Sequence, residues 1–120
     1  MFLQLNHQKL EIYKLSKQFV IHCYKLTKKF PIEEKYAMSQ QIRKAGLSVH
    51  LNLAEGFSRK SGAERKRFFE VSRGSIIEID AALDIAMELD YATLVEMDGM
   101  GICGKDCFKM LSSLINKSTT

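Results

Sequence analysis

Apolar residues recur at every third or fourth position along most of this 120-residue chain. That spacing is typical of amphipathic α-helices, whereas the two-residue alternation typical of half-buried strands is not sustained anywhere in the sequence. We therefore predict an all-α protein whose helices form one domain over residues 1–120. The expected helices span residues 7–30, 32–57, 62–90 and 94–116. Because the connections are short, the predicted architecture is an antiparallel, up-down-up-down four-helix bundle.

Local signals mark the starts of three helices. Pro31 suits the first turn of the second helix, where its missing N–H is no loss. Ser61 and Glu64 have the spacing of a capping box and are predicted to open the third helix, and Thr93 and Glu96 repeat that spacing before the fourth. The fourth helix is the least regular, because glycines weaken helices by about 1 kcal/mol each. Its continuity stays open across Gly99, Gly101 and Gly104.

The first two helices carry a second apolar face besides the face that would form the core. A helix that is apolar on two faces needs two partners, and a small bundle covers only one of these faces well. The second faces either pack on neighbouring helices of the same chain or form an interface between subunits, and we favour the interface. The residues predicted to form it are Tyr13, Val20, Tyr24, Leu47 and Leu51.

Polar residues lie among small ones in the segment 40–61, QQIRKAGLSVHLNLAEGFSRKS. Small residues allow a neighbouring backbone to come close, and polar groups buried there must be paired or they lose about 1–3 kcal/mol. We therefore predict structural, paired roles for Asn52 and Glu55. Glu78 is expected to play a similar role.

The net charge of +4 hides a strong division along the chain. Seven acidic residues and no lysine or arginine lie in residues 74–98, whereas residues 43–73 hold three acidic and eight basic residues. The third helix thus begins basic and ends acidic, against its own dipole. The basic residues are Arg43, Lys44, Arg59, Lys60, Arg65, Lys66, Arg67 and Arg73.

A local rule broken at both ends of one helix suggests a functional cause. One interpretation is a surface for nucleic-acid phosphates around the second turn, with Arg59, Lys60, Arg65, Lys66 and Arg67 as the contacts. The remaining basic residues either contribute or pair with Glu55 and Glu78. A second interpretation is that the basic turn pairs with the acidic end of a neighbouring subunit or with a partner protein, as in a scaffold or adaptor. A third is that the turn is simply solvated.

The remaining chemistry argues against an enzyme or a cofactor protein. The three histidines lack a nucleophile or base at motif spacing, and we expect no catalytic residue, metal site or cofactor. The odd number of cysteines, Cys23, Cys103 and Cys107, predicts buried free thiols. No apolar run approaches the roughly 18 residues that span a bilayer, and the N-terminus lacks the features of a signal peptide. We expect a cytoplasmic protein without membrane contact.

Several short motifs, taken in their order along residues 10–90, resemble a known family. They are Tyr13-Lys-Leu-Ser, Phe30-Pro31, Gln41-Ile-Arg-Lys-Ala45, Asn52-Leu-Ala-Glu-Gly56, Arg59-Lys-Ser61 and Arg73-Gly-Ser75 followed by Glu78. The chain resembles the four-helix-bundle family that includes proteins encoded in intervening sequences of bacterial 23S rRNA genes, related to retroelement accessory proteins. The resemblance implies a ring, with pentamers known, no known enzymatic activity, and a suspected role in binding nucleic acid or a protein.

One departure from that family lies in the second helix. Val49-His50 stands where the family usually has Ile-Pro, and Gly46 stands where it usually has alanine. Because proline would kink the helix and remove a backbone donor, we predict a straighter second helix here. His50 is expected to be a hydrogen-bonded structural residue. The leading hypothesis is therefore a non-catalytic homo-oligomer that binds RNA or DNA through its basic surface.

Overall fold

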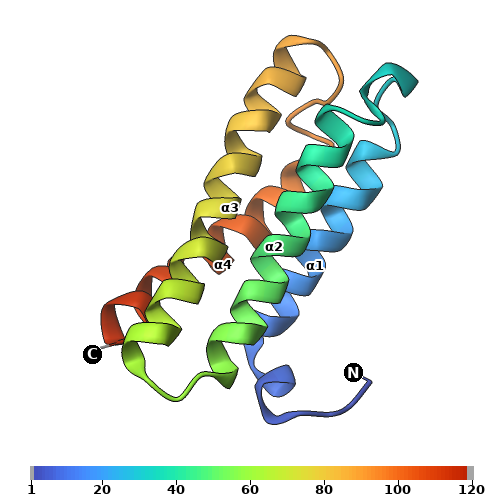
Figure 1. The fold of residues 1–120 in the computed structure, drawn as a ribbon. Helices are drawn as coiled ribbons and strands as arrows, with labels where there is room; N and C mark the ends of the chain where they lie inside the picture. Colours follow the sequence, from blue (N-terminus) through green and yellow to red (C-terminus); the bar gives the residue numbers. More distant parts are fainter. Residues whose placement is uncertain (1, 119–120) are drawn as a thin grey trace.

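A computed structural model describes residues 2–118 of the chain, and Figure 1 shows its fold. It contains four α-helices and two short 3₁₀ helices, and no strand occurs among these residues. The all-α prediction and the number of helices are confirmed. The helices are η1 (Asn6–Lys9), α1 (Glu11–Thr27), η2 (Ile32–Glu34), α2 (Met38–Ser58), α3 (Gly62–Glu88) and α4 (Asp98–Lys117).

The four α-helices lie side by side along the 43 Å long axis of the molecule, and the chain reverses its direction from each helix to the next (Figure 1). Helix α1 contacts α2 and α4, and α3 contacts the same two helices. The contact between α2 and α3 is the most extensive, and the contact between α3 and α4 is the smallest of these four. The α2–α3 turn and the last turn of α4 lie at the same end of the molecule.

The first two α-helices are shorter than predicted. Residues 6–9 form η1, and Leu10 is extended, so α1 begins at Glu11 and ends at Thr27. Pro31 precedes η2 instead of opening α2. Helix α2 begins at Met38, whose backbone N–H donates to the Glu34 carboxylate at 3.2 Å. The carboxylate that caps α2 thus comes from residues that the Pro31 signal predicts to be part of the helix itself.

The ends of α3 show one confirmed signal and one missed signal. Ser61 caps the helix, and its Oγ accepts from the Glu64 N–H at 3.1 Å. The helix stops at Glu88, before the predicted end at Asp90, because Asp90 adopts a left-handed φ of 61°. The Tyr91 N–H then donates to the Ala86 carbonyl at 2.8 Å, which closes the helix end as in a Schellman motif.

Helix α4 begins later than predicted and is continuous. The box of Thr93 and Glu96 does form, since the Thr93 N–H donates to the Glu96 carboxylate at 3.0 Å. It closes a turn ahead of the helix, which starts at Asp98. The helix then runs without a break past Gly99, Gly101 and Gly104. The open question about its continuity is answered by packing, because buried residues recur along α4 at Met100, Cys103, Cys107, Leu111 and Ile115.

Buried apolar residues from all four helices form one cluster, and two glycines set the spacing within it. A Cβ added at Gly46 would lie 3.2 Å from the Cys23 sulfur of α1. A Cβ added at Gly56 would lie only 2.6 Å from the Phe69 ring of α3. The small residues of segment 40–61 thus allow α1 and α3 to approach α2, and α2 continues unbroken through Val49 and His50.

Candidate nucleic-acid interface at the α2–α3 turn

The structure divides the eight basic residues between distant parts of the molecule. Arg43 and Lys44 lie near the start of α2, while Arg59 follows its last residue. At a rise of about 1.5 Å per residue, Arg43 and Arg59 are separated by about 24 Å along the axis. Arg73 lies in the middle of α3. Only the five residues from Arg59 to Arg67 therefore gather around the α2–α3 turn.

Arg43 ties the start of α2 to the end of α1. Its Nε donates to Thr27 Oγ1 at 2.7 Å, and Nη2 donates to the Tyr24 carbonyl at 3.3 Å. The guanidinium also lies over the Tyr24 ring, 4.9 Å from its centroid. These contacts use two of the guanidinium nitrogens and one face of the group within the chain. Lys44, the next residue, is exposed on the outer side of α2.

Arg59 and Arg65 are held against the turn itself. Arg59 pairs with Glu55, lies 3.9 Å from Glu64, and stacks on the Phe68 ring. Arg65 Nε donates to the Arg59 carbonyl at 2.7 Å, and its Nη2 reaches the Phe57 carbonyl at 3.4 Å. Arg65 therefore satisfies carbonyls at the end of α2, where intrahelical donors run out.

Arg73 joins α3 to α4. Its Nη1 donates to Ser112 Oγ at 3.0 Å, and its guanidinium lies 5.8 Å from the centre of the Phe108 ring. The predicted pairing of Arg43 or Arg73 with Glu55 or Glu78 does not occur. Glu55 binds Arg59 instead, and Glu78 accepts a hydrogen bond from Gln41. The four arginines with partners thus act within the fold.

Three of the predicted cations remain free at the α2–α3 turn. Lys60, Lys66 and Arg67 are exposed, and none of their side chains forms a hydrogen bond or ion pair within residues 2–118. Beside them is a hollow of about 370 Å³ that Lys60 and Arg65 share with Lys117 of α4. Lys117 is exposed as well. We call Lys60, Lys66, Arg67 and Lys117 the basic end.

Lys117 was missed by the sequence reasoning because it lies more than fifty residues from the turn. The topology of the bundle could have indicated the position of Lys117. In a bundle of four helices with short connections, the end of the fourth helix lies beside the second turn.

Serines carry the polar contacts between α2 and α3. Asn52 Nδ2 donates to the Ser48 carbonyl at 2.9 Å, and Ser48 Oγ lies 2.8 Å from Ser75 Oγ on α3. Ser72, which is fully buried, donates to the Val49 carbonyl at 2.6 Å. The structure thus places the half-buried Asn52 in a paired polar network. No hydrogen-bonding role was predicted from the sequence for Ser72 or Ser75.

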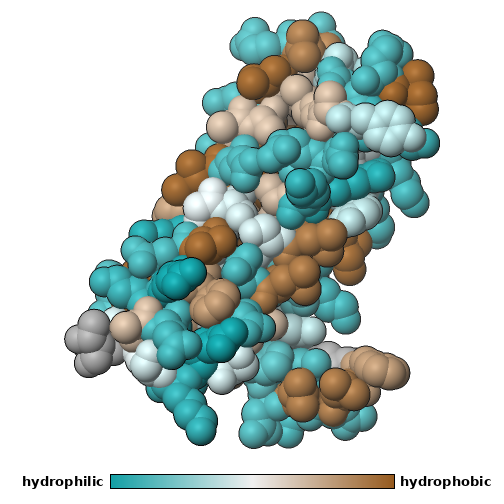
Figure 2. All heavy atoms as spheres, in the orientation of Figure 1, coloured by the Kyte–Doolittle hydropathy of each residue, from teal (hydrophilic) through white to brown (hydrophobic). Residues whose placement is uncertain are grey.

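The five residues predicted to form an oligomer interface differ in exposure. Val20 is buried, while Tyr13 and Tyr24 are half-buried against His50 and Arg43. Leu47 and Leu51 are 38% and 59% exposed on the outer face of α2. Figure 2 shows brown, hydrophobic side chains on the face of the molecule that α1 and α2 share. The outward apolar surface of α2 is therefore present, whereas Val20 packs inside the chain.

His50 is hydrogen-bonded within the seam between α1 and α2. Its Nδ1 lies 2.7 Å from Oγ of the buried Ser16, and the Tyr13 ring packs on its imidazole. Burial lowers the pKa of His50 below its ordinary value, and the nearby charges of Lys17 and His7 act in the same direction. The expected structural role of His50 agrees with these contacts.

All three cysteines are buried and free. Burial raises the pKa of Cys23 and Cys107 to about 12, so their thiols stay protonated near neutral pH. Within residues 2–118, no group of three or more histidine, cysteine, aspartate or glutamate side chains is arranged to hold a metal ion. None of the helices in that range is long and apolar enough to cross a membrane.

Comparison with known proteins identifies the family of this chain. Residues 8–113 match the model of the family described as "23S rRNA-intervening sequence protein". The chain belongs to this family. The match extends through most of α4, which the sequence motifs had not covered.

A solved structure supports the fold of this intervening-sequence protein. It is the crystal structure of a protein of unknown function from the S23 ribosomal protein family of Bacteroides thetaiotaomicron, which is 22% identical to this chain. The TM-score is 0.80, and the match covers 88% of this chain and 99% of the other. At that identity the likeness concerns the fold alone. Among curated proteins, none matches this chain.

Proposed function

We propose that this protein is a non-catalytic, homo-oligomeric binding protein that engages the phosphate backbone of RNA or DNA through its basic end. The proposal rests on one observation: some basic side chains at this end of the molecule have partners within the chain, and others have none. Arg59 and Arg65 bind carboxylates and carbonyls of their own chain. The side chains of Lys60, Lys66, Arg67 and Lys117 form no hydrogen bond or ion pair with residues 2–118. Unpaired cations on one surface bind phosphates by releasing counterions.

The proposed contact set is thus smaller than the one expected from sequence. Arg65 supports the surface by binding the Phe57 and Arg59 carbonyls just before Lys60, and Arg59 pairs with Glu55. Arg43, Lys44 and Arg73 lie elsewhere and are left out. Since no base-reading motif is present, we expect little sequence preference.

Assembly would multiply the effect of a modest surface. We propose that the chain is an antiparallel bundle that forms a closed ring in the cytoplasm, with five copies as the family resemblance implies. The exposed Leu47 and Leu51 support this, because an outward apolar face on a helix favours contact with another copy. A ring would present several basic ends together and raise the affinity through avidity.

An electrophoretic shift with a structured RNA at low salt tests the proposal. The variant Lys60→Ala/Lys66→Ala/Arg67→Ala should weaken binding by at least about tenfold, since three phosphate contacts are lost. The matched control is Lys14→Ala/Lys25→Ala/Lys28→Ala, which removes the same charge from exposed positions on α1 and its end. Equal losses in both variants would mean that only net charge matters and would refute the proposed surface.

The same experiment separates the proposal from a protein scaffold. If the wild-type chain does not shift RNA at low salt, and a structure of its assembly shows Lys66 and Arg67 paired with acidic residues of a neighbouring copy, then the basic end is a subunit contact. That outcome would replace the nucleic-acid function with a scaffold or adaptor.

A further inference from the structure

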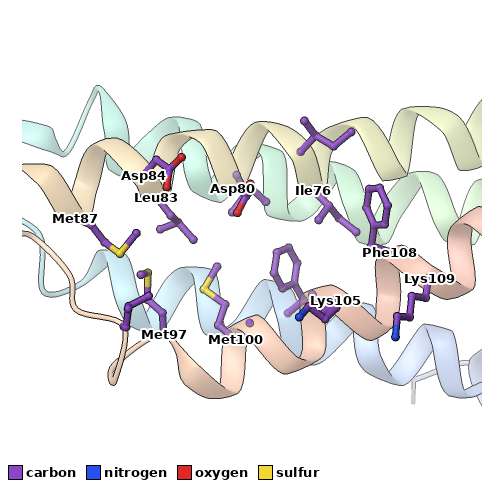
Figure 3. Close-up of a pocket in the computed structure, with 16 residues that line it drawn as sticks. Ile76, Asp80, Leu83, Asp84, Met87, Met97, Met100, Lys105, Phe108 and Lys109 are labelled. Carbon is purple, nitrogen blue, oxygen red and sulfur yellow. The ribbon is translucent and has the colours of Figure 1, made fainter.

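A groove of about 850 Å³ lies between α3 and α4. It lies away from the basic end, along the half of α3 that carries the acidic residues. Three of the six methionines in the chain line it, namely Met87, Met97 and Met100. Figure 3 shows these side chains between the two helices, together with Leu83 from α3.

The walls of the groove are apolar and partly open to solvent. Ile77 is 55% exposed and Leu94 is 74% exposed, and both line the groove. The groove follows the two helices from Met87 to Ile76 on α3, a distance of about 17 Å at 1.5 Å per residue. This length corresponds to three helical turns.

The two rims of the groove carry opposite charges. Asp80 and Asp84 project from α3, and Lys105 and Lys109 project from α4 (Figure 3). All four are exposed, and none of the ion pairs found in residues 2–118 joins one rim to the other. Each rim therefore offers two like charges one helical turn apart, about 6 Å along the axis. A ligand with basic groups along one side and acidic groups along the other could pair with both rims.

We propose that this groove binds an amphipathic helix of a partner protein, with bases along one edge of its apolar face and acids along the other. Two packed helices form a natural seat for a third, whose apolar face enters the groove at i, i+3, i+4 and i+7 spacing. The thioether side chains adapt their shape to such a face. Charges on the occupant that recur every fourth residue would match the spacing of both rims.

Other occupants fit these charges less well. An anionic amphiphile would gain Lys105 and Lys109 but would face Asp80 and Asp84 on the opposite rim. A nucleic acid would meet the same carboxylates. An extended strand needs a sheet edge for its backbone hydrogen bonds, and the walls here are helices, whose backbone groups are already paired.

A synthetic helical peptide is the probe. It carries leucines at i, i+3, i+4 and i+7, lysines along one edge and glutamates along the other, and its binding is followed by fluorescence anisotropy at low salt. We expect saturable binding at micromolar concentration. A peptide with glutamine at every edge position should bind about tenfold more weakly, since it loses both rows of charge pairs. Absence of saturable binding up to millimolar peptide would overturn the proposal.

Two glycines supply a blocking variant and its control. Gly101 lines the groove, and a Cβ added there would meet no atom within 4 Å. Gly101→Leu should fill the groove without disturbing the core and abolish peptide binding. Gly74, on α3 outside the groove, has equally free surroundings, so Gly74→Leu makes the same chemical change elsewhere. Binding that survives in Gly101→Leu, or is lost equally in both variants, would contradict the proposed seat.

The charges also predict the direction of the peptide. The wild-type rims hold the lysine edge against α3. Exchanging the rim charges in Asp80→Lys/Asp84→Lys/Lys105→Glu/Lys109→Glu should keep the affinity and turn the peptide end for end. Energy transfer from a dye on Val95→Cys, an exposed position beside Leu94, to either end of the peptide reads this direction. An unchanged direction would contradict the role of the rims.

Light scattering of the same variants tests whether the occupant is a second copy of this chain. Gly101→Leu should keep the mass of the wild-type particle. If the particle dissociates in Gly101→Leu and not in Gly74→Leu, the groove is a subunit interface, and the partner-protein proposal fails.

Discussion

The α2–α3 contact and the α3–α4 contact share one helix but differ in construction. Between α2 and α3, Gly56 lets the helices approach closely, the side chains of three serines form hydrogen bonds across the contact, and Phe69 is almost completely buried. Between α3 and α4, three methionines, the half-buried Leu83 and the exposed Leu94 line an open groove, and the charged rims stay unpaired. The same helix thus presents a closed face for stability and an open face that is free for binding.

The largest expected effect comes from truncating one large side chain on each face. Phe69→Ala should lower the free energy of unfolding by about 3–5 kcal/mol, because it opens a cavity in a tightly packed site. Leu83→Ala, in the groove, should lower it by about 1 kcal/mol, since the side chain is already half exposed. Urea unfolding of both variants at one protein concentration checks this. Equal losses would erase the distinction between the two contacts.

A pair of glycine substitutions should differ in sign. Gly56→Ala places a methyl group 2.6 Å from the Phe69 ring, and we expect a net loss of about 1–2 kcal/mol from overpacking after the gain in helix propensity. Gly101→Ala meets no neighbouring atom and should gain up to about 1 kcal/mol from helix propensity. Thermal unfolding of the two proteins measures both. If Gly56→Ala stabilised the protein, the α2–α3 contact would have enough space for the added methyl group, which would contradict this prediction.

The end of α3 offers a smaller gain. Asp90 has a left-handed backbone and places an acidic side chain at the negative end of the helix. Asp90→Gly removes both penalties and should stabilise the protein by about 1 kcal/mol. Asp84→Gly, inside the same helix, is the control and should destabilise it slightly, by about 0.3 kcal/mol. Thermal unfolding of both variants at the same protein concentration shows whether each substitution stabilises or destabilises the protein.

The smallest expected effect concerns the α1–α2 seam and its pH dependence. Because burial lowers the pKa of His50, the folded protein favours the neutral imidazole, while the unfolded chain takes up a proton near the ordinary value of 6.5. The contribution of His50 to stability is therefore complete above pH 6.5 and is lost as the pH falls from there through the folded pKa. Urea midpoints on both sides of that pH should differ less in His50→Gln than in the wild-type protein.

The helices were predictable from sequence because burial imposes their period on the apolar residues. Pro31 shows the limit of that reasoning, since the start of α2 depends on the Glu34 carboxylate folding back onto the Met38 N–H. The basic surface shows this limit of prediction from sequence more clearly. The roles of Arg43 and Arg65 depend on which carbonyls lie within reach, and those are set by helix packing, which no local pattern records. The groove likewise depends on the distance between α3 and α4.

The salt dependence of RNA binding tests the proposed basic end most directly. A plot of log affinity against log salt should be steep for the wild-type chain. Its slope should be shallower by about 2–3 in Lys60→Ala/Lys66→Ala/Arg67→Ala, because each lost phosphate contact removes about 0.7 for a single strand and about 0.9 for a duplex. The control Lys14→Ala/Lys25→Ala/Lys28→Ala should keep the wild-type slope. Identical slopes in the wild-type protein and the basic-end variant would contradict the assignment of these three cations to phosphate binding.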